Sequence, residues 1–364
     1  MLFWSGSDGQ DVRTIEVLDD VDDWFNHCVQ SQDCNNSVAG SCSPSLLALS
    51  GDPCLTSFPS KQESKIIEIT PKKLEELQKR KVNGFGLEDG CPIGTVPISR
   101  TSPNSHWGED PPPPEAKLVH CVAGVQTSED SSRNFLGVSG TLLVFKPTVY
   151  DDGQYSSARI KLINGKDSVE AGYLVSPKLF NDSEAHLYVS FEVGGSKLGC
   201  VNLQCFGFVQ VDKDVALGYP PTHYSVIGGQ LWSWDLSIQK DIIDQNWWVY
   251  ISSAPIGYWP NEIFDSLVDF ANQVEWGGEV YDFGLKNPPS SLPDMGSGMK
   301  GSYQKSAAAI YHATYLDDNY VNRTNPDRTN TIANCDPDYV VLDNGYINDE
   351  FGRVIHFGGA HDEN

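Results

Sequence analysis

Short runs of alternating or continuously apolar residues follow one another along the chain from about residue 117. Each run has the length of a β-strand, and glycine or proline pairs such as Asn164-Gly165 and Gly228-Gly229 separate them. The runs lie at 142–149, 158–163, 168–175, 185–192, 206–211, 231–238 and 247–252. A stripe of apolar residues with the 3.6-residue period of a helix occurs in this part only at 260–273. The pattern therefore predicts an all-β fold, an antiparallel sandwich of two sheets, with one short helix.

The first 115 residues have a different pattern. Residues 11–29 are acidic with apolar positions at helical spacing, and Thr70-Pro71 reads as the start of a second helix that ends before Asn83-Gly84. The region closes with Asp110-Pro-Pro-Pro-Pro-Glu115, whose prolines favour an exposed, semi-rigid polyproline II spacer. We therefore predict an N-terminal region with α-helices at 1–115, a proline-rich linker at 110–115, and a β-sandwich domain at 116–364.

The charge balance limits the partners. The 364 residues include 49 Asp and Glu against 25 Lys and Arg, a formal net charge of −24. Such a surface repels phosphate and anionic lipid, so we expect no nucleic-acid or membrane partner. Seven of the basic residues lie between Lys61 and Lys81. They form either a solvated helix face or a segment that docks on the acidic remainder of the same chain.

The cysteines and glycosylation sequons indicate the compartment. None of the nine cysteines forms a CxxC pair or a zinc-type spacing, so we expect disulfides. N-x-[ST] sequons at Asn35, Asn181 and Asn322 fit passage through the secretory pathway. The opening residues lack the charged and apolar parts of a signal peptide, which was then either removed or lies upstream of this start. We therefore expect a secreted protein, extracellular or in an acidic vacuolar compartment.

The familiar catalytic and cofactor motifs are missing. The sequence has no HExxH, no GxSxG and no P-loop, and the GxGxxG match at 296–301 follows a Pro/Ser-rich loop rather than a core strand. The acidic positions 336, 338 and 343 do not have EF-hand spacing. We expect no metal and no cofactor, so any hydrolysis would depend on carboxylates.

Three glutamates lie in predicted strands beside glycines. In 168–175 the alternation places Glu170 on the face that also carries Gly172, opposite the apolar positions. In 274–281, Glu275, Gly277, Glu279 and Tyr281 share a face. Glu275 and Glu279 would stand about 13 Å apart along the strand, so only one of them can pair closely with Glu170. A strand carboxylate of this kind is usually a surface residue or a member of a buried pair, and that interpretation stays open beside a catalytic one.

A series of motifs, in order along the chain, resembles the neprosin family of glutamic endopeptidases. Gly90-Cys-Pro-Ile-Gly-Thr-Val-Pro-Ile98 with Arg100-Thr101 resembles the end of the family's activation peptide, and Ser168-Val-Glu-Ala-Gly-Tyr173 resembles the motif of the first catalytic glutamate. The other matching segments are 199–210, Asn246-Trp-Trp248, 256–260, 274–280, 295–298 and 357–359.

The resemblance implies a secreted zymogen whose propeptide inhibits a β-sandwich with a substrate cleft. It implies Glu170 and Glu279 as the catalytic pair, with Glu275 as the fallback, acting as general base and general acid on a water molecule. Cleavage is expected on the carboxyl side of proline at acid pH, in a monomer. Tyr173, which stands where the family usually has Trp, together with Trp276 and Tyr281, is expected to contact the substrate.

The resemblance also implies disulfides, Cys200 with Cys205 and Cys28 with Cys91. The chain lacks the family's cysteine after the last Gly-Gly, so Cys335 is expected to lack its usual partner.

Two other functions remain open. A two-carboxylate glycoside hydrolase fits a sandwich with two glutamates and many tryptophans. A non-catalytic secreted binding module fits equally, with Trp247, Trp248, Trp259 and Trp276 as a proline groove, a sugar platform or simply core.

Overall fold

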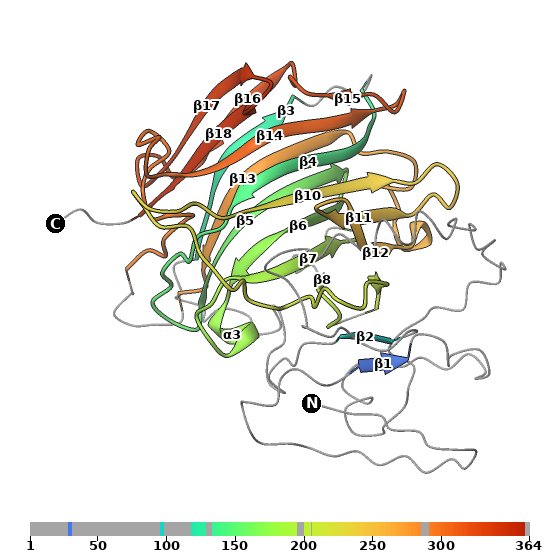
Figure 1. The fold of residues 1–364 in the computed structure, drawn as a ribbon, viewed down its shortest axis with the longest axis horizontal. Coiled ribbons are helices and arrows are strands. Elements are labelled where there is room, and N and C mark those ends of the chain that lie inside the picture. Colours follow the sequence, from blue (N-terminus) through green and yellow to red (C-terminus); the bar gives the residue numbers. More distant parts are fainter. Residues whose placement is uncertain are drawn as a thin grey trace, which may run out of the picture.

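The computed structural model describes residues 28–30, 95–97, 118–128, 133–194, 200–204, 206–284 and 291–360. Two large antiparallel sheets, shown as curved layers in Figure 1, make up almost all of this part. A separate two-stranded pairing joins β1 (Cys28–Gln30) to β2 (Thr95–Pro97). The predicted all-β, two-sheet sandwich is confirmed.

The seven-stranded sheet carries the glutamates, and we call it the site sheet. Its strands pair in the order β16 (Thr329–Ala333), β3 (Val119–Thr127), β13 (Gln273–Asp282), β5 (Gln154–Asn164), β6 (Asp167–Val175), β7 (His186–Glu192) and β8 (Cys200–Val201). Strand β5 is therefore central, with β13 on one side and β6 on the other, and all three are paired antiparallel.

The second sheet has nine strands. Their order is β17 (Tyr339–Asn348), β18 (Gly352–Gly359), β14 (Ala308–Asp317), β4 (Phe135–Leu143), β10 (Ser233–Lys240), β11 (Trp247–Ile251), β12 (Ala254–Trp259) and β9 (Val209–Gln210), with β15 (Asn322–Arg323) paired to β14. Two short helices are described, α3 (Pro177–Phe180) and the 3₁₀ turn η2 (Asn261–Ile263).

The core lies between the two sheets and explains the alternation in the sequence. Tyr173 of β6 points into it and meets Trp234 of β10 edge-on, with ring centroids 6.3 Å apart. Trp276 of β13 is fully buried, and its indole Nε1 donates to the backbone oxygen of Ser139 on β4 at 2.9 Å. Trp247 and Trp259 are buried in the same core, whereas Trp248 lies outside it, next to Tyr258. Three of the four tryptophans weighed in the sequence therefore serve packing.

The helix predicted at 260–273 is wrong beyond its first turn. Only η2 forms, and the chain then bends around the carboxylate of Asp167 on β6. Asp167 Oδ2 accepts the backbone N–H groups of Asp265 at 2.7 Å and Ser266 at 2.6 Å, with Leu267 at 3.2 Å. These are donors that a helix would have directed to its own carbonyls, so a tertiary contact replaces the helix.

One disulfide expectation is corrected, and others fall outside the described residues. Cys335 does have a partner: it is bonded to Cys121 of β3, 214 residues away in sequence. Cys200 is disulfide-bonded, but Cys205 and Cys91, named as partners in the predicted pairs, are not among the described residues. The predicted helices and the proline-rich linker also lie outside the described residues, except that the last two positions of 11–29 belong to β1.

Candidate active site

The register of the site sheet brings the glutamates around one arginine. Lys161 of β5 pairs with Glu170 on one side and with Glu275 on the other, so these three form one row across the sheet. Arg159 lies two residues before Lys161 on β5, with its side chain on the same face. Glu279 stands two residues beyond that, opposite Ser157. The row of Arg159 therefore lies between the row of Glu170 and Glu275 and the row of Glu279.

Glycines fill the positions on either side of Arg159. It pairs with Gly172 on β6 and Gly277 on β13, and Gly277 pairs in turn with Gly124 on β3. A Cβ at Gly172 would lie 1.9 Å from the carbonyl oxygen of Ala158, and a Cβ at Gly277 would lie 2.4 Å from that of Ala123. Only glycine fits such close backbone approaches. The row leaves space above the sheet, which the arginine side chain occupies.

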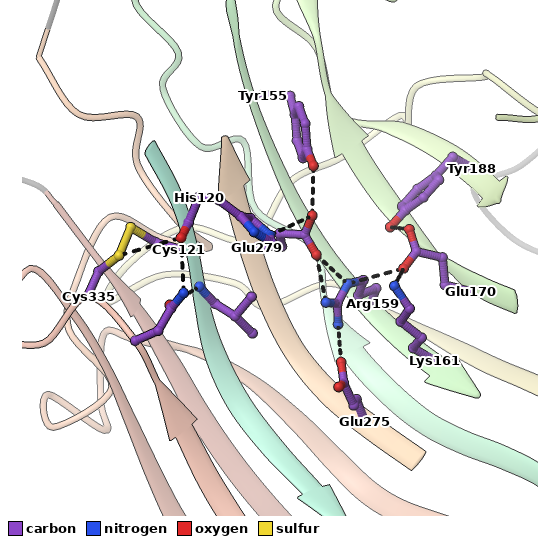
Figure 2. A network of polar contacts seen from close by, with 12 residues as sticks. His120, Cys121, Tyr155, Arg159, Lys161, Glu170, Tyr188, Glu275, Glu279 and Cys335 are labelled. Carbon is purple, nitrogen blue, oxygen red and sulfur yellow. Dashed lines mark hydrogen bonds and ion pairs between the residues drawn. A yellow bond between two sulfur atoms is a disulfide. The ribbon is translucent and has the colours of Figure 1, made fainter. Parts of the chain in front are cut away.

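Arg159 contacts all three glutamates, as Figure 2 shows. Its Nη2 donates to Glu279 Oε2 at 2.6 Å, and its Nη1 donates to Glu275 Oε2 at 3.3 Å. Its Nε lies 3.1 Å from Glu279 Oε2 and 3.2 Å from Glu170 Oε2. One nitrogen thus lies between the two glutamates that the sequence named as a pair.

Four further side chains complete this arrangement. Tyr155 Oη donates to Glu279 Oε1 at 2.7 Å, and Tyr188 Oη donates to Glu170 Oε1 at 3.1 Å. Lys161 Nζ lies 3.3 Å from Glu170 Oε2, and His120 Nε2 lies 3.3 Å from Glu279 Oε1. Each glutamate of the pair therefore has one tyrosine and one further basic group besides Arg159.

Contacts with Asn334 and Cys335 hold the strand that carries His120. The side-chain amide of Asn334 accepts the backbone N–H of Val122 at 2.7 Å and donates to the backbone oxygen of His120 at 3.0 Å. The Cys121–Cys335 disulfide adds a covalent link at the same place (Figure 2).

Burial and charge perturb the ionisation of the site. Burial acts to raise the pKa of Glu279, but the charge of Arg159 and the hydrogen bond from His120 outweigh it and hold the pKa well below 4.5. Burial and the neighbouring Glu279 raise the pKa of Tyr155 well above 10, and burial with Glu170 does the same for Tyr188. Burial acts to lower the pKa of Arg159, yet the charges of Glu279, Glu170 and Glu275 outweigh it and hold that pKa well above its ordinary value. Glu279 is therefore ionised and both tyrosines are donors across the physiological range.

An aromatic cluster adjoins Glu279. The rings of Tyr155 and Tyr281 are stacked, with centroids 5.5 Å apart, and Phe283 contacts Tyr281 at 4.5 Å. His120 reaches the other side of Tyr281, at 5.2 Å. Tyr281 thus lies on the glutamate face, as the alternation in the sequence requires.

Two other residues expected to contact substrate lie elsewhere, which corrects that expectation. Tyr173 and Trp276 have no exposed surface and point into the core, on the opposite face of the site sheet from the glutamates. Successive strand residues point to opposite faces, so neither can touch a molecule bound beside Glu170. Of the sequons, Asn181 and Asn322 are exposed, and Asn35 is outside the described residues.

The sequence interpretation missed the groups that surround the glutamates. Arg159 and Lys161 alternate along β5 with the buried apolar residues Ala158, Ile160 and Leu162, and Tyr155 and Ser157 continue the same face. The signal was a pair of basic side chains inside a predicted strand. Their meaning depended on the partner strands, because the contacts with Glu279 join residues more than 100 positions apart.

The described residues contain no cluster of metal ligands and no membrane-spanning helix. There, no three His, Cys, Asp or Glu side chains are arranged to hold a metal ion. No helix in the same part of the chain is long and apolar enough to span a membrane.

Comparisons with known proteins identify a family and similar solved structures. The family model described as Neprosin matches residues 152–360. Among solved structures, scytalido-glutamic peptidase in complex with a peptide-based transition-state analogue is similar, with a TM-score of 0.36 and 9% identity. That similarity covers 67% of this chain and 98% of the other.

Proposed function

The chain belongs to the neprosin family, and on that premise we propose that it is a glutamic endopeptidase whose catalytic pair is Glu170 and Glu279. Membership of this family implies a peptidase that acts on peptides. The contact that carries the choice of residues is the shared one: both carboxylates lie within 3.2 Å of Arg159 Nε. Glu275, by contrast, contacts Nη1 and not Nε.

The hydrogen bonds support different roles for the two members. Glu279 accepts two hydrogen bonds from Arg159 and one from Tyr155, and hydrogen bonds to a carboxylate favour its ionised form. Glu170 accepts one directed hydrogen bond, from Tyr188, and its Oε2 lies beside Arg159 and Lys161 without accepting a hydrogen bond. We therefore assign Glu279 as the general base and Glu170 as the general acid.

The proposed reaction returns both residues to their starting states. Glu279 takes a proton from water as the water oxygen bonds to the scissile carbonyl carbon, while Glu170 donates its proton to the carbonyl oxygen. As the C–N bond breaks, the leaving nitrogen takes the proton held by Glu279. Glu170 recovers its proton from the hydroxyl as the new carboxyl group forms.

The aromatic cluster supports cleavage after proline. Proline rings bind well in aromatic-lined grooves, and Tyr281 and Phe283 lie beside the proposed base. Tyr281 is only half-buried, so a substrate ring can reach it. Acid pH suits the assignment, since Glu170 must carry a proton while Glu279 stays ionised.

We also propose that residues 1–115 form an inhibitory propeptide of a secreted zymogen. The Cys121–Cys335 disulfide suits an oxidising compartment, which supports secretion. The run of four prolines at 111–114 is then a site for self-cleavage. N-terminal sequencing after acid incubation tests this, and an intact chain or a cut elsewhere would refute it.

A cleavage assay tests the proposed function. The acid-treated protein is incubated near pH 4 with a peptide that contains one proline and with the same peptide carrying alanine instead. Mass spectrometry should find one cut, after proline. Glu170→Gln and Glu279→Gln should each abolish it, while Glu275→Gln should retain it. Circular dichroism confirms that each variant is folded at the assay temperature.

The same assay separates the alternatives. Loss of cleavage in Glu275→Gln with activity kept in Glu279→Gln would move the catalytic pair to Glu275. Release of reducing sugar from a polysaccharide panel, without peptide cleavage, would establish the glycoside hydrolase instead. No turnover of either substrate class by the processed protein would favour a binding module.

A further inference from the structure

We propose that Arg159 is a positioning residue that confines the reaction to low pH, and that Glu275 orients its guanidinium. This inference rests on the proposed function. It names a residue that touches no substrate but acts through the two glutamates that do.

The geometry excludes direct contact between Arg159 and a substrate. Its side chain is 3% exposed, against 14% for Glu279 and 16% for Glu170. The guanidinium lies in the glycine row, flanked by Gly172 and Gly277. A substrate above this face meets the carboxylates first.

The three donor nitrogens have separate tasks. Nη2 holds Glu279, Nη1 holds Glu275, and Nε lies between Glu279 and Glu170. A guanidinium is a rigid planar fork, so fixing Nη1 also fixes the direction of Nε. Glu275 thereby acts as the anchor that keeps Nε between the catalytic pair.

The positive charge of Arg159 changes how the two carboxylates, Glu170 and Glu279, titrate together. Two carboxylates alone repel each other, and that repulsion holds a proton on one of them to higher pH. A buried cation between them removes much of the repulsion. An opposite charge at this range shifts the ionisation of a carboxyl by about 1–3 pH units. The cation thereby favours the state in which both carboxylates are ionised, and that state lacks the general acid and is inactive.

Other charged and titratable groups surround the three glutamates and Arg159, and one of them provides a control variant. On β5, Lys161 lies beside Glu170 and Tyr155 beside Glu279. Strand β3 contributes His120, and β7 contributes Tyr188 and Glu192. Burial, followed by the charges of the neighbouring Glu170 and Glu279, raises the pKa of Glu192, while Lys161 opposes this. Lys161 contacts Glu170 but makes no contact with Glu279, so it is the matched cation for comparison.

The test is the pH profile of kcat/KM on the proline peptide. Arg159→Gln removes the charge and should move the alkaline limb to higher pH by about 1–3 units. Arg159→Lys keeps the charge but not the fork, so it should leave the limb near its original pH while lowering kcat. Glu275→Gln keeps an oxygen that can accept from Nη1 and removes only the negative charge, so it should move the limb the opposite way, to lower pH.

Lys161→Met serves as the control, because Lys161 contacts Glu170 but not Glu279. It should move the alkaline limb, set by Glu170, but it should move the acid limb, set by Glu279, by less than Arg159→Gln does. An equal fall in kcat/KM at every pH in Arg159→Gln, with no displaced limb, would show a purely structural residue and overturn the proposal. So would a displacement of the acid limb by Lys161→Met as large as that by Arg159→Gln.

A second measurement needs no activity. Titration of ¹³C-labelled glutamate carboxyls by NMR, in the wild type and in Arg159→Gln, follows the cluster directly. The variant should titrate at higher pH, and unchanged titrations would overturn the proposal. If the wild type cleaves no peptide but the glutamates of Arg159→Gln titrate at higher pH than those of the wild type, the proposed function is refuted. The effect of Arg159 on the glutamates would then still stand. If Arg159→Gln does not fold, Glu275→Gln gives the opposite shift on which the same decision rests.

Discussion

Removing single hydroxyls from Tyr155 and Tyr188 should displace opposite limbs of the pH profile. Tyr155 donates to Glu279 at 2.7 Å, and Tyr188 donates to Glu170 at 3.1 Å. Substitution by phenylalanine removes only the donor and leaves each ring in place. The pair therefore tests which glutamate is the base and which is the acid.

The size of the effect follows from the geometry. A hydrogen bond to a buried charged group contributes about 1.5–3 kcal/mol. One pKa unit corresponds to about 1.4 kcal/mol, so loss of the Tyr155 hydroxyl should raise the pKa of Glu279 by about 1–2 units. The acid limb of kcat/KM, where the base becomes protonated, then moves up by the same amount. The longer contact of Tyr188 predicts a smaller displacement of the alkaline limb, also to higher pH.

The assay is kcat/KM for the proline peptide from pH 2 to pH 8 in the wild type and both variants. Thermal unfolding at each pH shows that the protein stays folded over the range used. Tyr155→Phe should narrow the active range from the acid side, and Tyr188→Phe should widen it on the alkaline side. Displacement of the alkaline limb by Tyr155→Phe would reverse the assignment of acid and base. Unchanged limbs in both variants would refute the argument that these hydrogen bonds tune the pair.

Two further predictions concern the fold. Gly172→Ala would place a Cβ 1.9 Å from Ala158 O, so it should cost about 1–3 kcal/mol in urea unfolding and reduce activity by displacing Arg159. Gly228→Ala is strained by a φ of 70° but lies in an exposed turn with no atom near its Cβ, so it should lower stability and leave activity unchanged. The pKa of Glu279 is held below 4.5, so its ionised form contributes stability that is present above the unfolded pKa and is lost as pH falls through the folded one. The Tm difference between wild type and Glu279→Gln should therefore stay constant from pH 7 to about pH 5 and change only below that, and a change nearer neutrality would contradict it.

The sandwich could be predicted because its signal is local. Alternation with a period of two placed Val169, Ala171 and Tyr173 on one face of β6 and Glu170 on the other, and the structure has them so. The helix at 260–273 failed because its apolar stripe was real but its backbone N–H groups were taken by Asp167, about 100 residues away. A local pattern does not contain that competitor.

The candidate site, like the fold, could be predicted from the sequence only in part. The strand alternation and the glycines brought Glu170, Glu275 and Glu279 to attention, and their shared face is a property of each strand alone. Their common partner could not be predicted, because strand order and register place β5 between β6 and β13. The partner of Cys335 was missed for the same reason, since Cys121 lies on a strand that meets residue 335 only in the folded sheet.

The placement of the site on strands rather than loops has a consequence for its chemistry. Glu170, Arg159 and Glu279 lie on three adjacent strands in the middle of a seven-stranded sheet, each paired on both sides. A shift of one residue in any of these pairings would turn the side chain into the core and bring an apolar residue out. The core residues Tyr173 and Trp276, on the reverse of the same strands, oppose such a shift because they are fully buried. Packing on one face therefore fixes the register on which the spacing of the carboxylates on the other face depends. Conservative changes at Tyr173 or Trp276 should accordingly lower kcat through the spacing of the glutamates, without altering which peptides are cleaved.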